Sequence, residues 1–471
     1  MVIVQFLTNI QGHFISIANF LLTLLFVSFI LRSKKPPGST MAWLIVIILI
    51  PYVGIPLYLI FSNRKFRTKL QKKEALFVPQ KIGYSENPDT VERILDNMGS
   101  PAAKINEQVS LLSTGQEAYF ELTRLIEAAT KTIHLTTFIF ADDQVGRALL
   151  NLLTKRASEG IRVRVLLDSL GSTWVRNPSF KELKKHGGQL GYFMPFLHMP
   201  FRGRYNLRNH RKILVVDSQK AILGGMNIAE EYMGPQASTS RWVDLGLKIQ
   251  GPSAFDLEGI FSKDWKFATG EDIGLTSHSG ATAGPAPSAS TNHDSNRVQI
   301  VASGPDVKGD PLYDVLLTLI FKARARIWIA SPYFIPDESL AKALQLAAQR
   351  GLDVRVLVPE KSNHPMADLA RGSYLKQIQS SGCQIRFLPR MIHAKAFLVD
   401  EEYALVGSAN FDMRSLLFNY EIGALISSKD EVAGLEKWFS SQFSQAQEKL
   451  PSSGLWIDLA EGIGRVLGPL I

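Results

Sequence analysis

The sequence predicts an α/β protein built from two duplicated halves that share one cleft, preceded by two apolar N-terminal segments. Three observations carry this prediction. A strand, a helix and a second strand occur twice in the same order, a histidine-containing segment occurs twice at identical spacing, and two long uncharged stretches precede them all. The length of 471 residues suits two core-forming units, because single hydrophobic cores usually stop growing near about 250–300 residues.

The two apolar segments, Phe14–Leu31 and Met41–Phe61, are candidates for transmembrane helices. Each is uncharged and long enough to cross the hydrocarbon core of a bilayer. A cleaved signal peptide is disfavoured for the first segment, because residues 1–13 lack Lys and Arg and the cations follow the apolar run instead. The second segment contains two prolines and a glycine, so a kinked helix or a re-entrant segment is the alternative there.

The formal charge of +9 is concentrated at the N-terminus. Residues 1–73 contain nine Lys and Arg and no acid, whereas the remaining 398 residues carry 43 residues of each sign. Three cations separate the apolar segments and six lie within residues 64–73, so the positive-inside rule predicts a multi-pass protein of the inner (cytoplasmic) membrane with its catalytic part in the cytoplasm. Such cations suit an anionic membrane lipid as partner, and the balanced charge elsewhere argues against nucleic acid.

The remaining elements follow in order along the chain. In the first half the apolar spacing predicts a helix at Gln116–Ala128, a strand at Thr132–Phe140, a helix at Gln144–Ser158 and a strand at Ile161–Asp168. The second half repeats the last three as a strand at Ile327–Phe334, a helix at Ser339–Arg350 and a strand at Leu352–Pro359. The predicted units are an anchor (1–63), a basic connector (64–105), a first half (106–273), a flexible linker (274–296) and a second half with an apolar C-terminal tail (297–471).

Each half also contains the polar pattern H-x-K-x4-D-x6-G-[GS]-x-N. The histidine and lysine stand two apart in an apolar, β-branched stretch, so a strand would direct both side chains to one face. The aspartate follows the histidine by seven residues, so it points the other way and is better assigned to structure. A single such histidine is more often a packing residue, but two at matched spacing favour catalysis. The motif gives the candidate catalytic set His210, Lys212, Asp217, His393, Lys395 and Asp400.

Through these motifs, in NHRKILVVD, GGMNIAEEY and IHAKAFLVD, the chain resembles the phospholipase D superfamily over essentially its whole soluble part. With the apolar stretch AWLIVIILIPYVGIPLYLIF it looks like the bacterial cardiolipin synthases in particular. The resemblance implies two phospholipase D-like α-β-α sandwich halves around one cleft, behind two N-terminal transmembrane helices. It also implies that His210 attacks phosphorus, forming a phosphohistidine, while His393 protonates the leaving group.

The chemistry explains why these residue types are needed. A phosphodiester anion repels nucleophiles, so Lys212 and Lys395 would supply the positive charge that other phosphoryl-transfer enzymes take from metals. The sequence thus predicts neither a cofactor nor a metal site. Asn227, Ser408 and Asn410 are the candidate phosphate-binding residues. Because WVDLG aligns with NYEIG, the candidate acids that orient the histidines are Asp244 and Glu421, in line with acidic residues at this place in the superfamily.

Three other features are assigned more modest roles. The adjacent Asp142 and Asp143 would face opposite ways on a strand, so a turn or a helix N-cap is favoured over metal binding. The one cysteine, Cys383, excludes an internal disulfide and is read as a small buried side chain. The stretch 191–210, rich in aromatics and arginines, is either a lipid-entry lip or an ordinary packed loop.

The expected reaction is transfer of a phosphatidyl group from one phosphatidylglycerol to another, with release of glycerol. A membrane-bound phospholipase D-type hydrolase would use the same residues with water as acceptor, and phosphatidylethanolamine is the alternative co-substrate. A nuclease is disfavoured by the neutral soluble part, and a non-catalytic scaffold by the complete motif in both halves. The sequence leaves the oligomeric state and the preferred acyl chains open.

Overall fold

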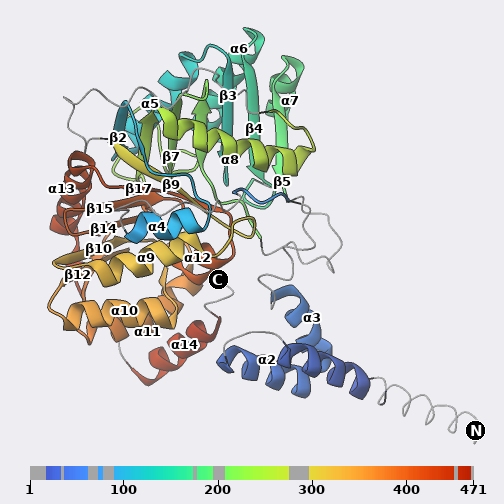
Figure 1. The fold of residues 1–471 in the computed structure, drawn as a ribbon, viewed down its shortest axis with the longest axis vertical. Coiled ribbons are helices and arrows are strands. Elements are labelled where there is room, and N and C mark those ends of the chain that lie inside the picture. The colour runs from blue at the N-terminus through green and yellow to red at the C-terminus, as the bar shows by residue number, and fades with distance from the viewer. Residues whose placement is uncertain are drawn as a thin grey trace, which may run out of the picture. The chain divides into compact units, whose positions relative to one another are not determined.

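In the computed structural model the described residues are 17, 19–32, 37–61, 73–77, 90–172, 178–194, 207–274, 296–449 and 454–467. They fall into an N-terminal unit within residues 1–70 and a main unit within residues 71–197 and 207–471. Figure 1 labels most of the helices and many of the strands.

The N-terminal unit is helical. Residues 19–31 form one helix, and the second apolar segment is divided at Ile50 into α2 (Pro37–Leu49) and α3 (Pro51–Phe61). The break follows from Pro51, which has no N–H to donate and biases the preceding residue away from the helical region. Among the helices of the described residues, none combines the length and the apolar content that a membrane span requires. The kinked alternative therefore describes the second segment better than a single straight helix.

The first half of the main unit is a seven-stranded mixed sheet with strand order β2-β8-β7-β6-β3-β4-β5. Three of its strands are parallel neighbours: β3 (Thr132–Thr137), β4 (Arg162–Asp168) and β5 (Gln189–Phe193). The antiparallel part consists of β2 (Gln108–Leu112), β6 (Ile213–Val216), β7 (Lys220–Gly224) and β8 (Gly246–Gln250). The helices of this half are α5 (Gly115–Glu127), α6 (Gln144–Ser158), α7 (Pro178–Lys185) and α8 (Pro252–Thr269).

The second half repeats this plan in a nine-stranded sheet with strand order β1-β9-β17-β15-β14-β10-β12-β13-β18. Its strands are β1 (Lys104–Ile105), β9 (Arg297–Ser303), β10 (Arg326–Ala330), β12 (Asp353–Pro359), β13 (Gln384–Leu388), β14 (Ala396–Val399), β15 (Tyr403–Gly407), β17 (Glu421–Ile426) and β18 (Gln447–Glu448). A separate pair comprises β11 (Phe334–Ile335) and β16 (Phe411–Asp412). The helices are α9 (Pro311–Lys322), α10 (Glu338–Gln349), α11 (Pro365–Gln379), α12 (Met413–Leu417), α13 (Lys429–Gln445) and α14 (Leu455–Leu467).

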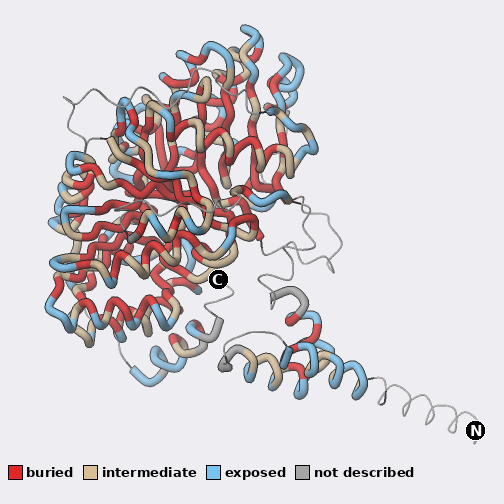
Figure 2. Tube along the Cα trace, viewed as in Figure 1, coloured by how far each residue is buried: buried red, intermediate tan, exposed pale blue. Residues whose placement is uncertain are grey.

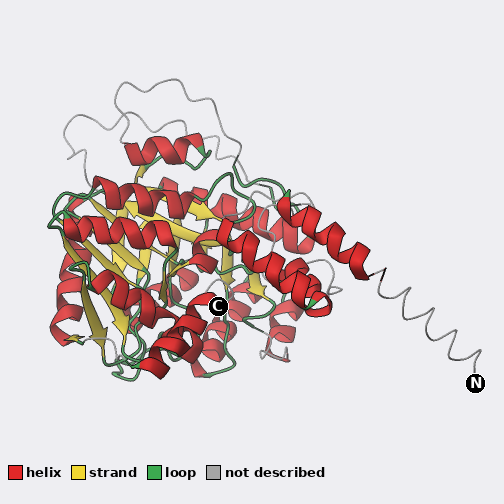
Figure 3. Cartoon of the chain, turned by 90° about the horizontal axis from the view of Figure 1, so that it is seen from below, coloured by secondary structure: helices red, strands yellow, loops and turns green. Residues whose placement is uncertain are grey.

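The predicted strand-helix-strand repeats are confirmed in both halves, and helix α6 has the predicted bounds. The predicted strand Ile327–Phe334 is wrong in one respect, because it is divided into β10 and β11. Pro332 lies between them and cannot donate a hydrogen bond to a sheet ladder. Each half is an α-β-α sandwich, with its sheet lying between helices in Figure 3.

Burial shows how the halves are joined. Outer cores lie beneath α5, α6 and α7 in one half and beneath α9 and α10 in the other. A third core contains side chains of both sheets together with α8 and α13, so the two halves share one apolar interior. Figure 2 shows the buried residues following the strands of both sheets. The junction of the two halves is therefore a packed and rigid place for a site.

The end of the predicted connector needs a correction. Helix α4 (Thr90–Asn97) buries Val91 and Leu95 completely in the core of the second half, and Glu92 forms an ion pair with Arg297 at 2.7 Å. Strand β1 also pairs with β9. Residues 90–105 thus belong to the second half. The sequence did not predict this, because a short amphipathic helix within a polar stretch has too little apolar content to stand out. The linker 274–296 lies outside the described residues except at its two ends.

Candidate active site

The two histidine and lysine pairs lie immediately before β6 and β14, in extended segments that join the halves. His210 N–H donates to Tyr420 O at 2.9 Å, and His393 N–H donates to Val243 O at 2.7 Å. The predicted strands therefore begin later than expected, at Ile213 and Ala396. The residues ahead of them pair with the opposite half instead of continuing their own sheet, so both motifs end at one junction.

Asp217 and Asp400 close the far ends of the same strands. Both residues have φ near 52° in a turn, and their carboxylates accept backbone N–H groups at the start of β3 and β10. For Asp217 burial opposes ionisation, but the N–H groups of residues 130–132 keep the pKa below its usual range. This agrees with the assignment of both aspartates to structure, which was made from their spacing of seven residues after the histidine. Their inclusion in the catalytic set is corrected, because their carboxylates are occupied in holding the turn.

The two predicted orienting acids contact the histidines, and each does so across the halves. His210 Nδ1 lies 3.0 Å from Glu421 Oε2, and His393 Nδ1 lies 2.7 Å from Asp244 Oδ2. Both carboxylates are buried, at 0% and 2% exposure. An acid in this position holds the imidazole with Nδ1–H toward it, which leaves Nε2 available for reaction. Sequence alignment of the two repeats could not have assigned which acid serves which histidine.

Ser408 has a different role from the predicted one. Its hydroxyl donates to Glu421 and accepts the N–H of Ile422 at 3.0 Å, and the residue is fully buried. A hydroxyl has one proton to donate, so none remains for a phosphate oxygen. At the equivalent position, a Cβ on Gly225 would lie only 2.3 Å from Asp244 Oδ1. The size of the residue at this position thus suits the neighbouring acid in each half. Gly225 leaves room for Asp244, and Ser408 donates to Glu421.

Asn227 and Asn410 are both buried, at 1% and 7% exposure. The Asn227 Oδ1 accepts the N–H of Ile139 at 3.1 Å, and the Asn227 side chain also hydrogen bonds with Tyr232. The Asn410 Oδ1 is buried without a hydrogen-bond partner among the described residues. Their phosphate-binding role stays a prediction.

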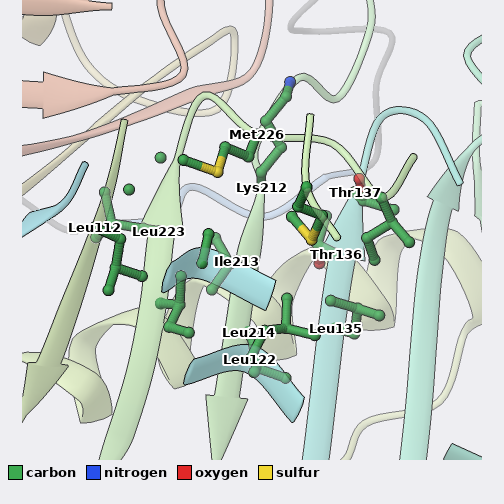
Figure 4. A pocket seen from close by; sticks show the side chains of 16 residues that line it. Leu112, Leu122, Leu135, Thr136, Thr137, Lys212, Ile213, Leu214, Leu223 and Met226 are labelled. Carbon is green, nitrogen blue, oxygen red and sulfur yellow. The ribbon is translucent and has the colours of Figure 1, made fainter. Parts of the chain in front are cut away.

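The lysines lie beside the histidines of their own motifs. The Lys212 ammonium donates to His210 O at 2.7 Å, and that of Lys395 lies 2.8 Å from His393 Nδ1. Burial lowers the pKa of Lys212 to about 7 and that of Lys395 to about 8. Behind Lys212 is an apolar cavity of about 40 Å³, and Figure 4 shows the lysine nitrogen directed away from its leucine lining. A similar cavity of about 30 Å³ lies behind Lys395.

The two histidines have different surroundings. Phe138 packs edge-on against His210, with ring centroids 5.2 Å apart, whereas Tyr232 and Trp242 enclose His393 at 5.0 and 5.6 Å. Burial lowers the pKa of both imidazoles, and with the added repulsion of the Lys395 ammonium the pKa of His393 falls to about 3. Sequence reasoning missed these aromatic walls. The available signal was that Trp242 stands two residues before Asp244 in WVDLG and that Tyr232 ends GGMNIAEEY.

The remaining sequence candidates are placed as follows. Asp143 is the N-cap of α6 and accepts the N–H of Gly146 at 2.8 Å, as predicted. Arg208 of the proposed lip is buried 3.8 Å from Asp168, and residues 195–206 lie outside the described part. Cys383 is buried. In the part of the chain that the structure describes, no three His, Cys, Asp or Glu side chains are grouped to hold a metal ion.

Comparison with known proteins gives consistent results. Residues 122–265 and 316–443 match the family model described as cardiolipin synthase, PLD-like domain, and residues 21–63 match a phospholipase D-nuclease N-terminal model. Cardiolipin synthase 1 of Bacillus anthracis is 32% identical and cardiolipin synthase of Geobacillus kaustophilus 30%, each alignment covering 95% of this chain and 92% of the relative. The fold is similar to that of the phosphatidylserine synthase of Haemophilus influenzae, with a TM-score of 0.61 and 18% identity over 81% of this chain and 98% of that one.

Proposed function

The chain belongs to the family of phospholipase D-like cardiolipin synthases, and from this premise we propose that it transfers a phosphatidyl group between two phosphatidylglycerol molecules. The products are cardiolipin and glycerol. The observation that carries the proposal is the pair of histidines at one junction, each held through Nδ1 by a buried carboxylate of the opposite half. This arrangement leaves two Nε2 atoms for a nucleophile and a proton carrier.

In the first step His210 Nε2 attacks phosphorus, and the bond from phosphorus to the glycerol oxygen breaks. The departing oxygen takes a proton from His393 Nε2. Because burial keeps the pKa of His210 below its usual value, its Nε2 lone pair is available at neutral pH. Glu421 then stabilises the positive charge that His210 gains on forming the phosphohistidine, as an orienting carboxylate does in a catalytic triad.

In the second step His393 removes a proton from a hydroxyl group of the second phosphatidylglycerol. That oxygen attacks phosphorus and the bond to His210 breaks, which restores both imidazoles. Because the pKa of His393 is low, its imidazole is unprotonated at neutral pH and its Nε2 lone pair can accept this proton. The bound phosphodiester anion offsets the repulsion from Lys395, which favours the protonated imidazole needed in the first step.

The two lysines and two asparagines serve the phosphate oxygens. Lys212 and Lys395 belong to opposite halves, so together they place positive charge on both sides of a phosphate at the junction. The amide nitrogens of Asn227 and Asn410 are the hydrogen-bond donors proposed for the non-bridging oxygens. Neither lysine requires a metal ion to supply this charge.

The N-terminal unit holds the enzyme at its substrate. We place the protein in the inner (cytoplasmic) membrane, with residues 14–61 as the membrane-associated part and the main unit in the cytoplasm. The support is the uncharged composition of the two segments and the cations that follow them. Carbonate extraction of membranes tests this, because an anchored protein stays in the pellet, whereas release into the supernatant would contradict it.

The activity is tested with full-length protein in vesicles of phosphatidylglycerol, with products identified by mass. Cardiolipin and glycerol in equal amounts are expected, and the His210→Ala protein is the control. Phosphatidic acid with glycerol would instead indicate a hydrolase that uses water. In mixed vesicles, release of ethanolamine would show that phosphatidylethanolamine serves as co-substrate.

A further inference from the structure

Lys73 is the last of the nine N-terminal cations, and the structure buries it in the main unit. Its side chain is only 2% exposed. The ammonium donates to Asp264 of helix α8 and, at 2.7 Å, to Asp306, which follows strand β9. One cation therefore joins a carboxylate of the first half to a carboxylate of the second. The Lys73 ammonium is consequently not available to an anionic membrane surface. It should not be counted among the six cations of residues 64–73 that were expected to face the lipid.

Arg211 pairs with the same two acids. It stands between His210 and Lys212 in the sequence and is fully buried, with Nη1 2.8 Å from Asp264 Oδ1 and Nη2 3.5 Å from Asp306 Oδ1. Lys73, Arg211, Asp264 and Asp306 form a neutral group that we call the junction cluster. Removing one buried cation from such a group leaves a carboxylate without full compensation, which is strongly unfavourable.

The junction cluster reaches the His210 site by two routes. The Lys73 ammonium lies 4.4 Å from the centre of the Tyr420 ring, and Tyr420 O accepts the N–H of His210. Arg211 Nε donates to Glu421 O at 3.1 Å, and the Glu421 carboxylate holds His210. The backbone of the histidine and that of its acid are both supported by this cluster.

The second motif lacks a counterpart of Arg211. The residue between the histidine and lysine of the second motif is Ala394, which is buried and carries no charge. The cluster is therefore associated with the His210 motif and has no counterpart in the His393 motif.

We propose that Lys73 is a positioning residue, which ties the basic connector to the junction and holds His210 and Glu421 in register. The proposal deepens the function given above and rests on the role of His210 there. It assigns the connector a part in catalysis beyond that of a tether, because Lys73 completes the charge balance behind the nucleophile.

The test compares full-length variants in phosphatidylglycerol vesicles. Lys73→Met should lower kcat about tenfold or more with KM within about twofold, since misplacement of a catalytic group affects turnover more than binding. Lys73→Arg should recover part of the loss, because a guanidinium can pair with both acids. The matched control is Glu74→Gln in the same segment, where an exposed glutamate pairs with Lys266 at 3.1 Å. It should behave as the unmodified protein.

A further variant separates positioning from charge balance. Lys73→Met with Asp306→Asn removes one charge of each sign, so it should fold even where Lys73→Met alone does not. Its kcat should stay low if the ammonium positions His210. Full activity in this double variant, or Lys73→Met activity equal to that of Glu74→Gln, would overturn the proposal. Failure of the unmodified protein to form cardiolipin would instead refute the proposed function.

Discussion

The His210 and His393 sites come from one repeated sequence pattern, yet the two halves support them differently. His210 is held by a glutamate whose other contacts include the Ser408 hydroxyl. His393 is held by Asp244, which occupies the space left by a glycine at the position of that serine. The reach of the longer acid and the bulk of the serine compensate for each other, so both imidazoles receive the same contact at Nδ1.

The surroundings diverge further. The His210 side chain is 13% exposed and rests on a charged cluster through Arg211, whereas that of His393 is 6% exposed and enclosed by Tyr232 and Trp242. The two halves therefore share the histidine, its lysine and a buried acid, but differ in the residues that support them. We expect the more exposed imidazole to attack phosphorus and the enclosed one to move protons.

The largest effect is expected from removing each histidine, and the two variants should not behave alike. Both should lower cardiolipin formation by about 10⁴-fold or more. With a substrate whose leaving group departs without protonation, His393→Ala should accumulate a phosphatidyl adduct on His210, because transfer lacks a base. His210→Ala should accumulate none. Intact-protein mass spectrometry with peptide mapping measures this, and an adduct on His393 in the His210→Ala protein would reverse the two roles.

A smaller but still large effect is expected from the two acids. Glu421→Gln and Asp244→Asn should each lower kcat by about 10²–10⁴-fold, as loss of an orienting carboxylate does in a catalytic triad. With the same activated substrate the two should separate by step. Glu421→Gln should slow formation of the adduct, and Asp244→Asn should slow its decay. Single-turnover measurements decide this, and identical effects on both steps would break the proposed division of roles.

The matched glycine and serine should give effects of moderate size. Gly225→Ala places a Cβ 2.3 Å from Asp244 Oδ1, so it should lower the free energy of unfolding by about 1–3 kcal/mol. Ser408→Ala removes the donor to a buried carboxylate and should lower kcat about tenfold with a smaller loss of stability. Denaturant titration and initial rates measure both, and a Gly225→Ala protein of unchanged stability would refute the steric argument.

Much of the fold followed from the sequence, because strand and helix periodicities and the repeat are local properties. The histidines and lysines were found for the same reason, as was the structural place of the aspartates after β6 and β14. What could not be predicted depends on contacts between the halves. The crossed pairing of Glu421 with His210 and the burial of Lys73 join residues far apart in the chain. The donor role of Ser408 lies within the second half, but it became visible only once Glu421 was placed against His210.

Near neutral pH the smallest change is expected from the lysines, and it requires no substitution. In the free protein the pKa of Lys212 is about 7 and that of Lys395 about 8, both lowered by burial. As pH rises through these values the ammonium groups that attract the phosphodiester are lost, so kcat/KM should fall, and the loss of the Lys212 charge alone should account for about threefold between about pH 6.5 and 7.5. The pKa of His210 is already below its usual value, so its deprotonation should not oppose this fall.

In the complex the bound anion raises both lysine pKa values, so kcat should stay level to higher pH. Profiles of both constants at fixed ionic strength test the argument, with far-UV circular dichroism as the control for folding, and a kcat/KM that rises across this range would contradict it.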